Sequence, residues 1–227
     1  LQELPLIILA WRRALARGLG AADGTADLRR VVHCSDSGEH EIHRPEVGSI
    51  APHVQTITLR ADPKQLVMSS TTLCFSTPLR LQHNGHALPP GKLQARTLLL
   101  AIIRRANLLA EFHGDGPLLE DFAALSAACA DIRDEKRLTW LDWTRYSSRQ
   151  KQKMSLGGGV GTWRLEGPLA PFQPFLELGA WLHVGKETAF GLGRYTQTRG
   201  TPQDIPEDQA KSCERPRQVS EKEARIS

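Results

Sequence analysis

The chain has 227 residues, enough for one large domain or two small ones. Apolar residues make up 40% and charged residues 24%, which is the composition of a soluble globular protein and excludes a wholly disordered chain. The net charge of +4 permits an anionic partner without proving one. No run of 18 apolar residues occurs, so we expect no transmembrane helix.

The N-terminus and the cysteines bear on the cellular compartment. The chain begins with Leu1, so we expect a fragment or a protein whose start has been removed. The apolar residues 4–11 run directly into Arg12 and Arg13, whereas a secretory signal carries its charge before the apolar run. None of the four cysteines forms a Cys-x-x-Cys pair, which fits a reducing compartment and predicts a cytoplasmic protein.

The first 60 residues open with a helix, because Leu4, Ile8, Trp11 and Leu15 recur at helical spacing. Glycines predict a turn after it, and the Gly, Pro and Ser content of the next stretch predicts a loop or linker. The predicted order is helix, glycine-rich turn, strand, loop and short strand, over residues 3–17, 18–25, 28–35, 36–54 and 54–60.

The remaining chain alternates between the two kinds of periodicity. Leu73, Phe75, Leu79 and Leu81 fall on one side of a strand, and a long apolar stripe follows at helical spacing. The predicted elements are a strand, a helix, a second helical piece, two strands, a helix and a strand, over residues 71–81, 92–113, 121–132, 138–147, 160–166, 172–183 and 188–198. This order predicts a ferredoxin-like βαββαβ unit.

The two halves repeat one arrangement. A helix, a glycine turn and a strand occur at residues 4–35 and again at 172–198, and both copies contain Gly-Leu-Gly. The fold class predicted is α+β, with tandem ferredoxin-like domains of which the first is incomplete. The predicted division is a remnant of the first domain with a linker, a complete second domain and a disordered, proline-containing tail, over residues 1–60, 61–198 and 199–227.

A glycine turn is the first candidate site. Gly185, Gly191 and Gly193 stand between a predicted helix and strand, with Lys186 and Arg194 beside them. Glycine lets the backbone approach a ligand and point its N–H groups at phosphate oxygens. The alternative is a turn that needs glycine for positive φ and close packing. The spacing matches neither a dinucleotide-binding fingerprint nor a nucleotide P-loop, which argues against NAD and against ATP bound in a Walker loop.

A basic segment is the second candidate. Arg145, Arg149, Lys151 and Lys153 occur within nine residues that contain no acidic side chain, and Tyr146 adds an aromatic ring. Cations interleaved with an aromatic residue suit a phosphate backbone and unstacked bases. A solvated charged loop is the equally weighted alternative.

Histidines and tryptophans complete the candidates. His183 ends a predicted helix with Lys186 three residues further on, and a histidine can move protons in RNA cleavage near neutral pH. His33 is the reserve. Three tryptophans on predicted strands are expected in the core, with base stacking as the alternative: Trp140, Trp143 and Trp163.

The second half resembles the C-terminal domain of the CRISPR precursor-RNA-processing endoribonucleases of the RAMP superfamily. Four segments carry the resemblance, namely WLDWTRYSSRQ, MSLGG, LAPF and WLHVGKETAFGLGRY at residues 140–150, 154–158, 169–172 and 181–195. The resemblance covers residues 70–196 well and 1–35 faintly. It implies tandem ferredoxin-like domains, and CRISPR repeat RNA with other CRISPR effector subunits as partners.

The resemblance also implies a reaction. Metal-independent cleavage within the repeat, with no cofactor, would proceed by attack of a ribose 2′-OH and leave a 2′,3′-cyclic phosphate. His183 with Lys186 is the catalytic pair we favour, with His33 in reserve. Relatives extend further before the first helix, and in many the catalytic histidine lies there. The alternative is therefore a non-catalytic RNA-binding subunit or a truncated fragment of an effector complex.

Overall fold

The computed structural model describes residues 3–20, 23–35, 38–51, 69–114, 116–119, 121–147 and 152–199. The chain divides into two units, whose described parts are residues 3–51 and 69–199. The strand predicted at 54–60 lies outside the described residues, as does the predicted tail apart from Arg199, which ends a strand. None of the described helices is long and apolar enough to cross a lipid bilayer.

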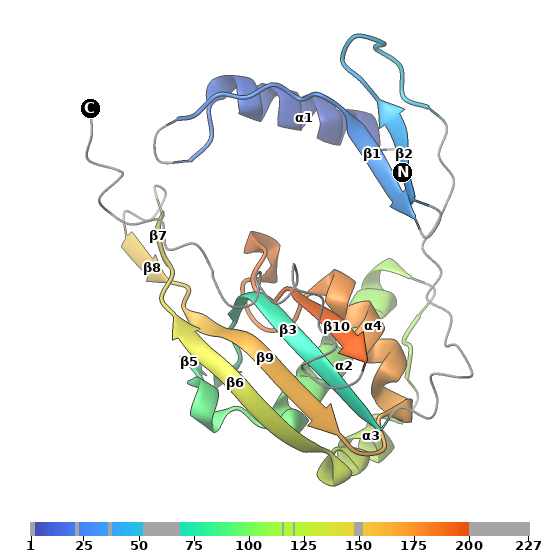
Figure 1. Ribbon diagram of the computed structural model, residues 1–227, viewed down its shortest axis with the longest axis vertical. Helices are drawn as coiled ribbons and strands as arrows, with labels where there is room; N and C mark the ends of the chain where they lie inside the picture. Colours follow the sequence, from blue (N-terminus) through green and yellow to red (C-terminus); the bar gives the residue numbers. More distant parts are fainter. Residues whose placement is uncertain are drawn as a thin grey trace. The chain divides into compact units, whose positions relative to one another are not determined.

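The first unit consists of one helix and one hairpin, α1 (Leu4–Arg17), β1 (Val31–Ser35) and β2 (Gly38–His43) (Figure 1). The two strands pair antiparallel, with His33 opposite His40. The prediction of an irregular loop over residues 36–54 is therefore wrong for β2. Its sequence, Gly-Glu-His-Glu-Ile-His, has almost no apolar alternation, so cross-strand backbone bonds rather than a buried face define this strand.

A glycine ends α1. Gly18 has a φ of 101° and donates its N–H to the carbonyl oxygen of Ala14 at 3.1 Å. A Cβ there would collide with the carbonyl oxygen of Asp23, because residues 19 and 24 pair across the turn. The helix buries only Ile8 and leaves several large apolar side chains exposed, namely Leu6, Ile7, Leu9 and Trp11.

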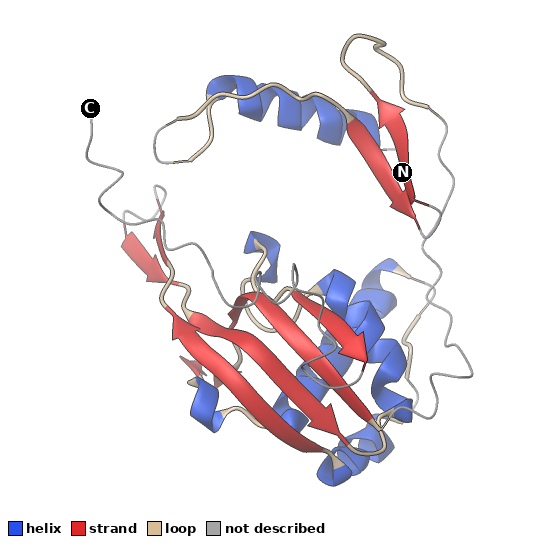
Figure 2. Ribbon diagram, in the orientation of Figure 1, coloured by secondary structure: helices blue, strands red, loops and turns tan. Residues whose placement is uncertain are grey.

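The second unit is built on a four-stranded antiparallel sheet in the order β10-β3-β9-β6. Its main elements are β3 (Ser70–Leu79), α2 (Ala95–His113), β6 (Arg133–Leu141), β9 (Gly158–Glu166), α4 (Gln173–Leu182) and β10 (Tyr195–Arg199). Both long helices cover the same face of the sheet (Figure 2). The predicted α+β class and βαββαβ order are confirmed for this unit.

Shorter elements surround this frame. Two small hairpins are β4–β5 (Gln82–His83 and His86–Ala87) and β7–β8 (Thr144–Ser147 and Gln152–Ser155). Helix α3 (Phe122–Ala128) begins at Asp121, whose side chain accepts from two backbone N–H groups. Single 3-10 turns lie at Pro90–Lys92, Cys129–Asp131, Ala170–Phe172 and Thr188–Phe190.

The core of the second unit lies between the sheet and the two helices. The fully buried side chains of the sheet include Leu73, Phe75, Trp163, Leu165 and Tyr195, and those of α2 include Leu98, Leu99, Ile102 and Ile103. Each such side chain contributes about 1.5–3 kcal/mol by leaving water. The Tyr195 hydroxyl donates to the carbonyl oxygen of Leu176 at 2.6 Å, which fixes α4 against β10.

Two predicted strands have different bounds in the structure. The strand predicted over 138–147 is two strands, β6 and β7. Strand β6 begins at Arg133, and the prediction missed its first half because five consecutive charged residues hide the alternation of this edge strand. The strand predicted over 188–198 begins only at Tyr195. Residues 188–190 instead form a 3-10 turn. Gly191 and Gly193 follow it with positive φ, so extended backbone begins only after them.

Candidate functional site: the glycine turn after helix α4

The glycine turn, residues 183–194, connects α4 to β10 and lies against the end of β3. Gly185 forms a bridge with Arg80, and the Lys186 N–H donates to the Arg80 carbonyl oxygen at 2.8 Å. On the other side of the turn, the Gly193 N–H donates to the Pro78 carbonyl oxygen at 3.0 Å. The turn is therefore fixed to the sheet at both of its ends.

The three glycines predicted to approach a ligand have different surroundings. Gly185 has a φ of 95°, and a Cβ there would lie 2.5 Å from the Arg80 carbonyl oxygen. Gly193 has a φ of 72°, and its Cβ would collide with the Val184 carbonyl oxygen. Gly191 has a φ of 83°, and a Cβ there would meet open space. Packing therefore explains Gly185 and Gly193, and only Gly191 is open to a ligand.

His183 has a backbone conformation that is otherwise almost confined to glycine. It follows the last residue of α4 with φ 60° and ψ 169°. Such a conformation costs a non-glycine residue of the order of 1–3 kcal/mol, and residues that carry this cost cluster at functional sites. The side chain is half-buried and forms a hydrogen bond with the Leu192 backbone. Glu187 in the same turn also has a positive φ, of 62°, but its ψ of 27° places it in the ordinary left-handed region, whereas the ψ of His183 places it in the nearly glycine-only region.

The surroundings of His183 favour its neutral form. Burial lowers the pKa of the imidazole from its ordinary value, and the positive charges of Arg194 and Arg105 lower it further, against the opposing hydrogen bond with Leu192. The ordinary value is about 6.5, so the ring is neutral at pH 7 and can accept a proton. A charged histidine that merely caps the end of the helix is disfavoured.

Two arginines at the turn are held by their own hydrogen bonds. The Arg105 Nε donates to the Leu182 carbonyl oxygen at 2.8 Å, next to His183. The backbone N–H of Arg194 donates to the Thr77 hydroxyl at 2.8 Å, and that hydroxyl in turn donates to the Gly191 carbonyl oxygen. Arg194 and Lys186 have exposed side chains. The sequence analysis missed Thr77 and Arg105, because both come from elements far away in the chain.

The two ends of the basic segment lie on the paired strands β7 and β8. Arg145 and Tyr146 lie on β7, and Lys153 lies opposite Tyr146 on β8. Arg149 and Lys151 lie outside the described residues. The residues after β8 return to the sheet, where the Gly157 carbonyl oxygen accepts from Arg80 at 2.8 Å. Arg80 also contacts the glycine turn, since its own carbonyl oxygen accepts from the Lys186 N–H.

The tryptophans divide between core and surface. Trp163 is fully buried, as predicted, and its Nε1 donates to Asp134 at 2.8 Å. Trp140 and Trp143 are 39% and 41% exposed, so the prediction that they pack in the core is wrong. They follow the charged half of edge strand β6, where a large side chain has less to pack against. Their exposed faces leave the stacking alternative open.

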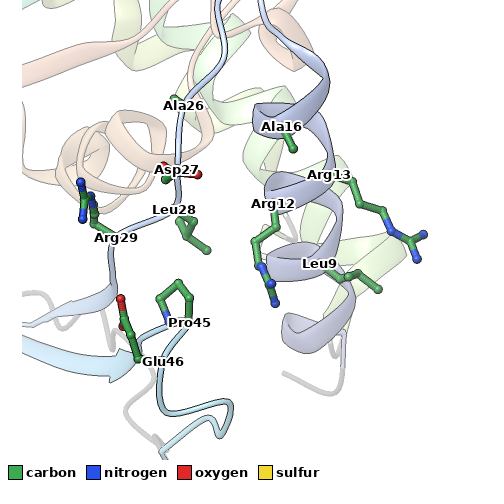
Figure 3. A pocket seen from close by; sticks show the side chains of 10 residues that line it. All are labelled: Leu9, Arg12, Arg13, Ala16, Ala26, Asp27, Leu28, Arg29, Pro45 and Glu46. Atoms are coloured by element: carbon green, nitrogen blue, oxygen red, sulfur yellow. The ribbon is translucent and has the colours of Figure 1, made fainter.

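The first unit holds the reserve histidine and a hollow of its own. His33 lies on β1, which pairs it with His40 of β2. A hollow of about 500 Å³ lies between α1 and residues 26–29, where Arg12 extends toward Leu28 and Pro45, and Arg13 points away (Figure 3). Two acidic residues, Asp27 and Glu46, share its lining. Among the described residues, no three His, Cys, Asp or Glu side chains are grouped closely enough to hold a metal ion.

The family model of the CRISPR-associated endoribonuclease Cas6 matches residues 73–195, just over half of the chain. The chain belongs to the Cas6 family. The match covers β3 to the first residue of β10, which is the sheet, both covering helices and the glycine turn. The resemblance stated from the sequence is thereby confirmed. None of the curated proteins matches the chain.

Solved Cas6 structures resemble the chain in fold. A product complex of Thermus thermophilus Cas6 matches with 16% identity and a TM-score of 0.53, over 86% of this chain and 71% of that one. A second Cas6 product complex has 21% identity, a TM-score of 0.41 and coverages of 62% and 54%. A further structure of Thermus thermophilus Cas6 has 16% identity and a TM-score of 0.45, and the match covers 58% of this chain and 54% of that one. The chain spans about half the length of the last two structures.

Proposed function

We propose that the chain binds CRISPR repeat RNA and cleaves it without a metal ion, so that precursor RNA is processed to guide RNA. Membership of a family of CRISPR-associated endoribonucleases supports the substrate class. The single observation that carries the catalytic proposal is the strained backbone of His183 at the turn, together with a pKa that burial and the charges of Arg194 and Arg105 lower. Other CRISPR effector subunits are the further partners we propose.

The reaction needs a base, a proton donor and stabilisation of negative charge. His183 takes the proton of a ribose 2′-OH, and the 2′-oxygen forms a bond to the adjacent phosphorus. The bond from phosphorus to the 5′-oxygen then breaks, and that oxygen takes a proton from water. The products are a 2′,3′-cyclic phosphate and a 5′-hydroxyl, with no electrons gained or lost.

Cations near the base stabilise the charge that develops on the phosphate. Lys186 has an exposed ammonium group three residues after His183, and Arg194 lies close enough to lower its pKa. Positioned cations of this kind stabilise a transition state because they need little reorganisation as the charge forms. The Gly191 backbone offers close approach. The basic segment, with Arg145, Tyr146, Arg149, Lys151 and Lys153, would hold the flanking RNA.

The test is a cleavage assay in EDTA. The full chain is incubated with end-labelled CRISPR repeat RNA and excess EDTA, and the product ends are identified. Cleavage that survives EDTA and leaves a 2′,3′-cyclic phosphate supports the proposal. RNA binding without cleavage would favour the non-catalytic RNA-binding subunit, and the absence of any RNA binding at low salt would overturn both.

A further inference from the structure

A groove with four cationic side chains runs beside the glycine turn in the second unit. It has a volume of about 460 Å³ and lies between one face of α2, the end of β3 and the first residues of the turn. Its charged and polar lining is Arg80, Gln82, Thr97, Arg104, Arg105 and Lys186, and the rest is apolar apart from Gly185. No acidic residue lines it.

The charge of this groove is not neutralised within the described part of the chain. No described carboxylate forms an ion pair with any of its four cations, although five ion pairs form elsewhere among these residues. Arg80 and Arg105 are half-buried and held by single bonds to the carbonyl oxygens of Gly157 and Leu182. Such bonds orient a guanidinium without removing its charge, so the groove is prepared for an anion.

Arg104 lines the groove and also contacts helix α3 through the ring of Phe122. Its guanidinium carbon lies 5.2 Å from the centre of the Phe122 ring, a contact that orients the side chain but leaves it exposed. One turn of helix separates Arg104 from Ala101, and Thr97 lies on the same face. The cations of the groove therefore come from two sides, from α2 and from the segments at residues 80 and 186.

We propose that this groove binds a run of RNA phosphodiesters that continues from the glycine turn, an inference that rests on the proposed function. Arginine guanidinium groups fit phosphate oxygens through paired N–H donors, and the apolar lining suits ribose and base faces. Lys186 and Gly185 belong to both the groove and the turn, so a strand bound at His183 enters it directly. This continuity favours RNA over an acidic peptide.

The test measures RNA affinity and its salt dependence for single-charge variants of the full chain. Fluorescein-labelled oligouridylate is titrated with wild type, Arg104→Gln and Arg105→Gln. The matched control is Arg96→Gln, which removes the same charge from the same helix, where Arg96 bonds to Ser126 outside the groove. Melting temperatures of all four proteins verify folding. Arg104 is exposed, so its variant tests the groove even if Arg105→Gln unfolds.

Each groove variant is expected to weaken binding about fivefold at about 0.1 M salt and to reduce the salt slope by about 0.7, the value of one lost single-strand phosphate contact. Arg96→Gln is expected to change the RNA affinity and the salt slope by less than either groove variant does. The inference is overturned if Arg104→Gln and Arg105→Gln bind RNA as tightly as wild type does. It is also overturned if polyglutamate competes with RNA for wild type as well as RNA itself does, and the affinity for polyglutamate is lost in these variants. A wild type that binds RNA through the groove but never cleaves would overturn the proposed function alone.

Discussion

The backbone N–H of Lys186 donates a hydrogen bond to the carbonyl oxygen of Arg80 at 2.8 Å, which joins the glycine turn to a residue more than 100 positions earlier. The Arg80 side chain meanwhile bonds to Gly157, beyond the basic segment. Arg80 thus bonds to the glycine turn and to Gly157, four residues after the basic segment ends. This residue therefore joins the glycine turn to the start of β9.

The two glycines of the Gly-Leu-Gly motif should respond differently to alanine. Gly193→Ala places a Cβ against the Val184 carbonyl oxygen, so the expected result is a destabilisation of at least about 1–3 kcal/mol or an unfolded protein. Gly191→Ala meets open space and should cost only about 1 kcal/mol from its positive φ. Thermal unfolding measures both, and equal losses would contradict the packing assignment.

Gly191→Ala also tests ligand approach. Because this variant should remain folded, its RNA affinity reports whether the backbone there contacts RNA. We expect weaker binding to repeat RNA than wild type shows in the same titration. Unchanged affinity would mean that Gly191 serves only the turn.

The rate of cleavage should follow the titration of His183. Burial and two arginines lower its pKa below the ordinary value of about 6.5, and the neutral ring is the base. The single-turnover rate should therefore rise with pH and level off below the pH at which an ordinary imidazole would. A rate that still rises steeply above pH 7 would point to another base.

Stability should depend on pH through the same group. The folded pKa of His183 lies below the unfolded value, so the unfolded chain binds more protons at mildly acidic pH. The stabilisation is present above about pH 6.5 and is lost as the pH falls through the folded pKa. Urea unfolding of wild type and His183→Asn between neutral and acidic pH should show a smaller loss in the variant; parallel curves would contradict this.

The exposed Trp143 should matter for RNA and not for folding. Base stacking on an aromatic ring contributes about 1–3 kcal/mol to single-strand binding. Trp143→Ala should lose binding energy of that order, whereas Phe112→Ala, which removes a more exposed ring from the end of α2, should lose none. Fluorescence titration with oligouridylate compares the RNA affinities of the two variants. Equal affinities would contradict a role of Trp143 in base stacking.

The fold of the second unit was predicted well because its helices and strands have clear apolar periodicity. The apolar stripe of α2 and the alternation in β3 set their faces, and the βαββαβ order allowed few topologies. Strand β2 and the start of β6 were missed because charged and polar residues mask a strand whose pairing depends on backbone bonds.

The candidate site was only partly predictable. His183, Lys186 and the glycines share one motif, so sequence proximity was enough to bring them together. Arg105 and Thr77 reach the turn from α2 and β3, and a sequence carries no signal for such contacts before the fold is known. The left-handed backbone of His183 was equally invisible, because only the tertiary structure imposes it.

The most direct test of the account replaces His183 with glycine. Glycine adopts this backbone conformation without strain, so His183→Gly should melt no lower than wild type, while loss of the proton acceptor should cut single-turnover cleavage of repeat RNA by about 10²–10⁴-fold with little change in affinity. A variant that folds and still cleaves at nearly the wild-type rate would contradict the central claim that His183 is the base.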